Sequence, residues 1–235
     1  MSDVGYRMSD VGETTEMKTS RWHGALQVEV AGEEVWLLPH RAAYWARART
    51  LLIADVHLDK CEAMRVNGMP VPRVMDEVIA RLEDAVRVTG AARVMVLGDL
   101  LHAPAGLTGA MIECFAAWRA SSSVELALVP GNHDRGLRHV QDAWRMTVLP
   151  EVYEEGPFTF THVPAPMAGR FVWGGHLHPA VTLRSSADSI KMACFHVGAG
   201  VGVLPAFSRF TAGGPLSRGR GDGVFAVAGD RVVPV

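Results

Sequence analysis

Four short apolar runs in this chain each end in polar residues whose side chains can bind metal ions. They cover residues 51–57, 94–102, 126–134 and 171–178. Continuous apolar runs of this length are typical of strands that are buried on both faces. We therefore predict four buried strands whose carboxyl ends carry the functional side chains, as in open α/β sheets.

Two helices are predicted between these strands. In residues 73–90, apolar side chains recur every three or four positions, and Gly90 supplies a stop signal. Residues 107–119 repeat this pattern. A strand–helix–strand order favours parallel pairing with right-handed crossovers. Residues 58–72 lack a sustained period and contain two prolines, so we predict a loop that covers the strand ends.

The regions on either side of this centre indicate further strands. Residues 26–30 and 35–38 predict a hairpin, and a second hairpin turns at Gly229-Asp230. Between them, a short helical piece at residues 137–144 precedes the strands of a second, more antiparallel sheet, at residues 158–162, 171–175, 180–184 and 192–197. The predicted fold class is α/β, with two packed mixed β-sheets flanked by helices in a four-layer α/β/β/α sandwich.

Composition adds limits to this picture. The 235 residues are 49% hydrophobic and 20% charged, which indicates one globular domain at residues 21–235 behind a flexible tail at residues 1–20. There is no run of 18 apolar residues and no signal-peptide pattern, so we expect a cytoplasmic protein without a membrane partner. Cys61, Cys114 and Cys194 are too far apart for a zinc ribbon and are predicted to be free thiols. A net charge of −2 and a pI near 6.5 give no general attraction to polyanions.

The polar residues at the strand ends have the chemistry of a metal centre that contains two ions. Two divalent cations about 3.5–4 Å apart can bind phosphate oxygens and hold a bridging hydroxide as the nucleophile. This mixture of histidine and oxygen ligands suits manganese, which we expect, or iron, zinc or cobalt, rather than calcium. The candidate ligands are Asp55, His57, Asp99, Asn132, His162, His176 and His178.

The order of these motifs, D-x-H, G-D-x-x-H, G-N-H-D and G-H-x-H, resembles the signature of the calcineurin-like metallophosphoesterases. The resemblance implies that one metal is held by Asp55, His57, Asp99 and His178. It implies that Asp99 bridges to a second metal held by Asn132, His162 and His176. His133 is then expected to protonate the leaving oxygen, with Asp134 orienting it. His102 stands where the family usually has Asp or Asn, and we expect it to support the metals or to contact substrate.

A narrower resemblance covers residues 25–215. Residues 42–45, 54–60, 65–72 and 204–211 are similar to bacterial phosphoesterases that are associated with a DNA ligase and a helicase in the DNA-damage response. This resemblance implies a DNA-repair endonuclease and a possible association with that ligase or helicase. Asp59 stands where that subfamily has glycine. Lys60, Arg65 and Arg73 lie near the first ligands, where they either contact a phosphate backbone or belong to a solvated loop.

Other functions remain open at this stage. The modest net charge also suits a phosphatase or a cyclic-nucleotide phosphodiesterase that acts on small molecules, because binding many DNA phosphates usually requires a basic stripe. An inactive metal-bound scaffold in a repair complex is a further alternative. The histidines outside the motifs are predicted to be structural or on the surface, namely His23, His40, His139 and His196.

Overall fold

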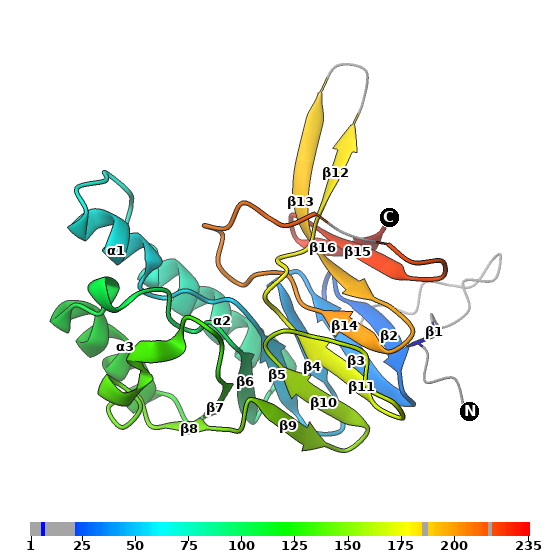
Figure 1. Ribbon diagram of the computed structural model, residues 1–235, viewed down its shortest axis with the longest axis horizontal. Coiled ribbons are helices and arrows are strands. Elements are labelled where there is room, and N and C mark those ends of the chain that lie inside the picture. The colour runs from blue at the N-terminus through cyan, green and yellow to red at the C-terminus, as the bar shows by residue number, and fades with distance from the viewer. Residues whose placement is uncertain (1–5, 8–21, 185–187, 216–217) are drawn as a thin grey trace.

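The first β-sheet follows the chain order from β1 to β8. The computed structural model describes residues 6–7, 22–184, 188–215 and 218–235 (Figure 1). Strands β1 to β5 pair antiparallel and β5 to β8 pair in parallel. The hairpin predicted at residues 26–30 and 35–38 is confirmed. The strands are β1 (Tyr6–Arg7), β2 (Leu26–Val30), β3 (Glu33–Leu38), β4 (Ala42–Trp45), β5 (Thr50–Ile53), β6 (Arg93–Leu97), β7 (Glu125–Val129) and β8 (Met146–Val148).

The second sheet is mixed and mostly antiparallel, as predicted. Its spatial order is β16-β15-β13-β14-β11-β10-β9, and β12 pairs only with β13. Strands β10, β11 and β14 form the parallel part. The β12–β13 hairpin projects from the body of the molecule (Figure 1). The strands are β9 (Val152–Glu155), β10 (Phe158–Thr161), β11 (Phe171–Gly174), β12 (Ala180–Arg184), β13 (Ser189–Val197), β14 (Val201–Val203), β15 (Gly223–Ala228) and β16 (Arg231–Pro234).

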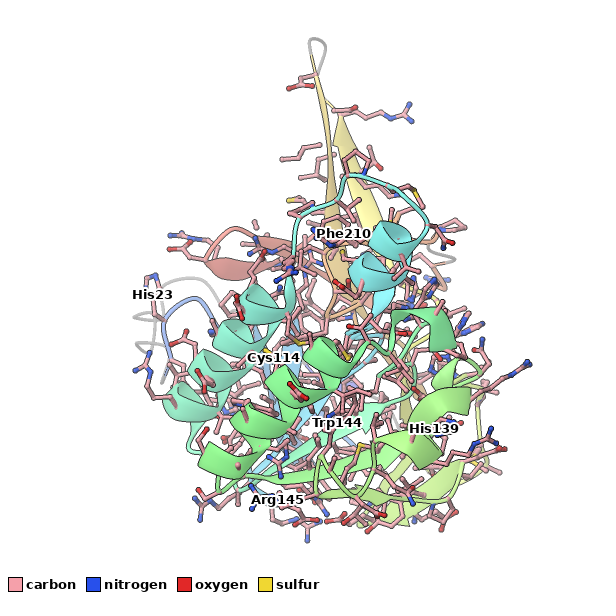
Figure 2. The ribbon with its side chains drawn as sticks, turned by 90° about the vertical axis from the view of Figure 1, so that its left-hand side faces the viewer. His23, Cys114, His139, Trp144, Arg145 and Phe210 are labelled. Carbon is pink, nitrogen blue, oxygen red and sulfur yellow. The ribbon has the colours of Figure 1, made fainter. Side chains whose placement is uncertain are left out.

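Two long helices cover the first sheet (Figure 2). Helix α2 (Met75–Thr89) buries Val78, Leu82 and Ala85 at helical spacing and ends at Gly90, which has a left-handed φ of 65°. Helix α3 (Gly109–Ser121) begins where the Thr108 hydroxyl accepts a hydrogen bond from the Met111 amide. Both helices confirm the sequence prediction. Among the helices of the described residues, none has the length and apolarity that crossing a lipid bilayer requires.

Two local predictions were wrong. The segment predicted as a loop at residues 58–72 contains helix α1 (Lys60–Val66), which buries Cys61 and Ala63. A helix of seven residues depends on such tertiary contacts, which a periodicity argument does not detect. The helical piece predicted at residues 137–144 is instead a 3-10 helix, η2 (Asp134–His139), which starts directly at the third ligand loop. A shorter 3-10 turn, η1 (Pro104–Gly106), precedes α3.

Alternating side chains of the first sheet build two cores. In β3, Trp36 and Leu38 face the helices, whereas Val35 and Leu37 face the second sheet. The core between the sheets is rich in fully buried aromatic residues, and burying each contributes roughly 1.5–3 kcal/mol. These aromatics are Trp45, Phe158, Phe160, Phe171, Trp173, Phe195 and Phe225. The predicted α/β sandwich of two mixed sheets is confirmed, and the long helices α2 and α3 pack on the first sheet.

The N-terminal prediction lies mostly outside the described residues. Of residues 1–20, only Tyr6–Arg7 is described, as a strand beside β2. The tail and the single domain at residues 21–235 stay predictions. The three cysteines are unpaired thiols, with Cys61 and Cys194 buried and Cys114 exposed on α3.

Candidate metal centre

The first group of candidate ligands joins the two sheets. Asp55 and His57 follow β5 in the first sheet, and His178 follows β11 in the second. Their ligand atoms all lie within 4.8 Å of one another, with His178 Nε2 3.1 Å from Asp55 Oδ1. Asp55 is fully buried and His57 is nearly so. The backbone amide of His176 donates to the Asp55 carboxylate at 2.9 Å, which links this group to the second one.

The second group is arranged around His162. Its Nε2 lies 3.0 Å from Asn132 Oδ1, 3.1 Å from His176 Nδ1 and 3.4 Å from Asp99 Oδ2. Asp99 follows β6, Asn132 follows β7, His162 follows β10 and His176 follows β11. The structure therefore brings all seven predicted ligands together at the carboxyl ends of five strands from the two sheets.

The backbone at the ligands is strained. Asp55, His57, Asp99, His176 and His178 all have positive φ angles, between 46° and 65°. Residues other than glycine rarely adopt this conformation, and such strain tends to persist at functional sites. The surrounding fold holds the backbone in this conformation, which positions these five side chains.

Close packing around the ligands explains the glycine that precedes Asp99. Gly98 has a φ of 77°, and a Cβ at this position would overlap the imidazole of His162. Gly175, which precedes His176, is similarly close, because a Cβ there would lie 2.5 Å from Asp55 Oδ2. The glycines of these motifs therefore leave room for ligand side chains that arrive from the other sheet.

The hydrogen bonds of the ligand side chains fit two cations. His57 Nδ1 lies 3.3 Å from the Leu101 carbonyl and His162 Nδ1 lies 3.1 Å from the Leu97 carbonyl. Donation to these carbonyls leaves each Nε2 atom with a lone pair. In the neutral ring, that lone pair of His162 faces the oxygens of Asn132 and Asp99, where a cation would satisfy all three atoms; without a cation, a proton on this nitrogen bonds to Asp99. His178 Nε2 is buried and, although it lies 3.1 Å from Asp55 Oδ1, the two atoms are not aligned for a hydrogen bond. A divalent cation bound in each group would satisfy these atoms.

Burial and neighbouring charges set the protonation of the centre. Burial lowers the pKa of His57 to about 4, against the opposing effect of Asp55 and Asp99, so its imidazole is neutral at pH 7. Burial alone would raise the pKa of Asp99, but hydrogen bonds from His162 and the His133 amide outweigh it and lower this pKa. His57 is therefore neutral and Asp99 ionised at pH 7, which are the forms that bind metals. Burial alone would lower the pKa of His162, but its hydrogen bond to Asp99 and the charge of Asp99 outweigh burial and raise this pKa.

His133 lies beside the candidate ligands, and a backbone carbonyl holds one of its ring nitrogens. Its backbone amide donates to Asp99 Oδ1 at 3.0 Å, and its Nδ1 lies 3.1 Å from the carbonyl of His102. The side chain is exposed, so Nε2 is available to a substrate. Its ring also stacks on the ring of His102, with centroids 5.3 Å apart.

Asp134 acts on the ligand loops through backbone contacts. Its buried carboxylate accepts from the Leu101 amide at 2.9 Å and the Gly131 amide at 2.8 Å. These bonds connect the loop after β6 with the loop after β7. The predicted orienting role is therefore indirect, because the His102 carbonyl holds the imidazole of His133.

Asp59 is a site residue that the sequence reasoning missed. Its fully buried carboxylate accepts from the amides of His102 at 2.5 Å and Ala103 at 2.9 Å. These contacts fix the loop whose carbonyl holds His133. The available signal was an acid two positions after His57, at the place where the resembling subfamily has glycine. His102 itself has a lowered pKa because of burial and nearby Lys60.

Residues predicted to lie outside the centre do so. His23, His40 and His196 pair with carboxylates elsewhere, at 3.1, 2.8 and 2.7 Å. The Arg65 guanidinium donates to the Val71 carbonyl and lies 3.6 Å from Glu62. Arg65 therefore has partners within its own segment, in α1 and the residues that follow it.

Comparisons with known proteins bear on this arrangement. The chain superposes on the crystal structure of Pseudomonas putida nuclease MPE with a TM-score of 0.77 and 29% identity, covering 90% of this chain and 100% of that one. The E. coli phosphoesterase YfcE matches at a TM-score of 0.43 and 15% identity, over 79% of this chain and 97% of that one, which is too weak to support an argument. No family model and no curated protein matches this chain.

The match to nuclease MPE extends over nearly the whole described chain, and the ligand groups lie where the four motifs predicted them. The resemblance inferred from the sequence is therefore confirmed. The chain therefore has the fold of nuclease MPE, and its ordered motifs resemble those of the calcineurin-like metallophosphoesterases.

Proposed function

We propose that this protein is a metal-dependent phosphodiesterase that acts on nucleic acid. The observation that carries the proposal is the pair of adjoining ligand groups, each with buried carboxylate and imidazole atoms. Two divalent ions bound there would supply Lewis acidity toward the phosphate oxygens and the hydroxide nucleophile. Manganese is our expected metal, because the mixed donor set suits it.

The proposed ligand sets follow from the two groups. Asp55, His57 and His178 would hold one ion. Asp99, His162 and His176 would hold the other together with the Asn132 amide oxygen, which is 3.0 Å from His162 Nε2, and we propose that Asp99 would contribute to both. Asp99 is suited to the bridge because it lies 3.4 Å from His162 and its charge also acts on His57.

His133 is the proposed general acid. With Nδ1 donating to the His102 carbonyl, Nε2 is the atom that can carry a proton to a leaving oxygen. Asp59 positions the His102 loop, and Asp134 positions the loop that carries His133. We assign these two acids a positioning role, because both carboxylates accept hydrogen bonds from backbone amides.

Similarity to nuclease MPE supports a nucleic-acid substrate. The net charge of −2 favours the second candidate, a phosphatase or cyclic-nucleotide phosphodiesterase of small molecules. A phosphatase differs from the other candidates in preferring a monoester, so substrate choice separates it. A cyclic-nucleotide phosphodiesterase also cleaves a diester, but its substrate binding should depend little on salt, unlike that of a nuclease.

The test compares bis-p-nitrophenyl phosphate with p-nitrophenyl phosphate, using metal-stripped protein refilled with manganese. Asp99→Asn removes the bridging carboxylate, and Asp84→Asn serves as a control because Asp84 pairs with His40 outside the centre. We expect diester cleavage that requires manganese and that Asp99→Asn loses. Preference for the monoester would favour the small-molecule candidate. Metal binding without any cleavage would favour an inactive scaffold.

A further inference from the structure

A basic cavity adjoins the first ligand group. It has a volume of about 190 Å³ and is lined by the ligand His178 and by three basic residues, Arg41, Lys191 and Arg209. No acidic side chain is among its lining residues. The overall charge of the chain is −2, so this concentration of cations is local. The cavity lies at the foot of the β12–β13 hairpin, near Phe210 (Figure 2).

Two residues of this cavity belong to a cluster of three arginines that share one nearby carboxylate. Arg209 lies 3.0 Å from Glu77, and Arg81 lies 3.4 Å from the same oxygen. Burial lowers the pKa of Arg41, and burial with repulsion from Arg209 and Arg41 lowers the pKa of Arg81 to about 10. The cluster of Arg41, Arg81 and Arg209 therefore carries more positive charge than Glu77 neutralises.

The same backbone segment holds these arginines and a metal ligand. Arg41 donates to the Ser208 carbonyl at 2.9 Å, and Arg81 donates to the Phe207 carbonyl at 2.5 Å. The amides of Phe207 and Ser208 in turn donate to the carbonyls of Ala54 and Asp55, at 2.8 and 3.2 Å. The cations are thus fixed relative to Asp55 by a short chain of hydrogen bonds. This segment lies within residues 204–211, one of the stretches of the narrower resemblance.

We propose that this cavity binds a backbone phosphate next to the one being cleaved, so that the substrate is a polynucleotide strand. The inference rests on the proposed function, because it extends the same site. Guanidinium groups bind phosphate through charge-assisted hydrogen bonds, and Lys191 adds a point charge. The Lys191 ammonium is held by the carbonyls of Ala212 and Gly213, which fixes it at the rim of the cavity.

Arg209→Ala is the informative variant, because the Arg209 side chain is 63% exposed and its removal leaves the core intact. Arg184→Ala on β12 removes the same charge outside the cavity and serves as the matched control. Glu77→Gln removes the carboxylate that pairs with Arg81 and Arg209 and has the opposite expected sign. The probe is a fluorescent single-stranded oligodeoxythymidylate, and binding is measured by anisotropy on metal-free protein across a salt series.

We expect Arg209→Ala to weaken oligonucleotide binding about tenfold, as loss of one charge-assisted hydrogen bond does. The slope of log affinity against log salt should fall by roughly 0.7, the value for one phosphate contact on a single strand. Glu77→Gln should tighten binding, and Arg184→Ala should change the slope less than Arg209→Ala. In manganese-loaded protein, Arg209→Ala should lower the ratio of kcat/KM for the oligonucleotide to that for bis-p-nitrophenyl phosphate, also about tenfold.

Equal effects of Arg209→Ala and Arg184→Ala would overturn the proposal, because general charge would then suffice. Inorganic phosphate that displaces the oligonucleotide at equal phosphate concentration would indicate a site for free anions instead of a strand. Binding is measured without turnover, so failure of the proposed hydrolase activity is distinguishable from failure of the cavity. An active enzyme whose oligonucleotide binding is insensitive to Arg209→Ala would refute the cavity alone.

Discussion

Adding one methyl group at Gly98 should disable the second ligand group. The Cβ of Gly98→Ala would overlap the imidazole of His162, which the Leu97 carbonyl and Asp99 hold in place. Either the ring or the backbone must move. Gly90→Ala provides a matched control, because Gly90 has a similar φ of 65° and nothing lies within 4 Å of the added Cβ.

The expected loss in the free energy of unfolding has two parts, the backbone strain that both variants share and the steric overlap that only Gly98→Ala causes. Placing alanine in a left-handed conformation costs about 1–2 kcal/mol at either position. At Gly98 the displaced imidazole also loses its hydrogen bond to the buried Leu97 carbonyl, which costs about 1–3 kcal/mol. We therefore expect Gly98→Ala to lower the free energy of unfolding by about 2–5 kcal/mol, and Gly90→Ala by about 1–2 kcal/mol.

Urea unfolding of metal-free protein and manganese titration together provide the assay. Wild type and Gly90→Ala should bind about two manganese ions, whereas Gly98→Ala should bind about one tightly. The reasoning is refuted if Gly98→Ala retains both ions with wild-type affinity, because His162 would then not be a ligand held by this packing. Equal destabilisation by both variants would show that backbone strain alone accounts for the cost.

Three further predictions concern protonation and metal binding. His133→Ala should slow oligonucleotide cleavage by about 10²–10⁴-fold. The loss should be smaller on bis-p-nitrophenyl phosphate, because its leaving group needs no proton. Equal losses on the two substrates would argue against a general acid. In metal-free protein, His57 should titrate near pH 4 by NMR. As the pH drops from 6.5 to 4, His57 takes up a proton in the unfolded chain but stays neutral in the folded protein. The free energy of unfolding should therefore fall by roughly 3 kcal/mol. His57→Gln should remove this part of the loss. Chelation of protein held at a hundredfold the metal Kd should remove about 2.7 kcal/mol per site, visible as a lower Tm, and an unchanged Tm would contradict tight binding by the native state.

Local sequence patterns were sufficient to predict the strands that carry the candidate ligands and the positions of those residues at the strand ends, but not the strands β4, β8, β9 and β14. Each ligand directly follows a strand or lies a few residues beyond it, so an apolar run and the polar cluster behind it can be recognised in one window. Helix α2 was equally visible, because Val78, Leu82 and Ala85 recur on one face before Gly90. These features depend on residues that are close in sequence.

Features that depend on distant residues were not predictable in this way. Helix α1 is short and is stabilised by burial of Cys61 and Ala63. Asp59 reaches the amides of His102 and Ala103, more than 40 residues away. The arginine cluster combines side chains from three separate segments, at Arg41, Arg81 and Arg209, and no charge pattern along the chain indicates their meeting.

The candidate metal centre lies between the two sheets, and this location has a consequence for biosynthesis. Each ligand group takes side chains from both sheets, with Asp55, His57 and Asp99 from the first and His162, His176 and His178 from the second. A nascent chain that has emerged only as far as β8 carries the first sheet but just part of either group. Metal capture would therefore come late in maturation, once the second sheet has docked through the apolar core, and we expect scarcity of the ion to leave a folded molecule with empty ligand groups.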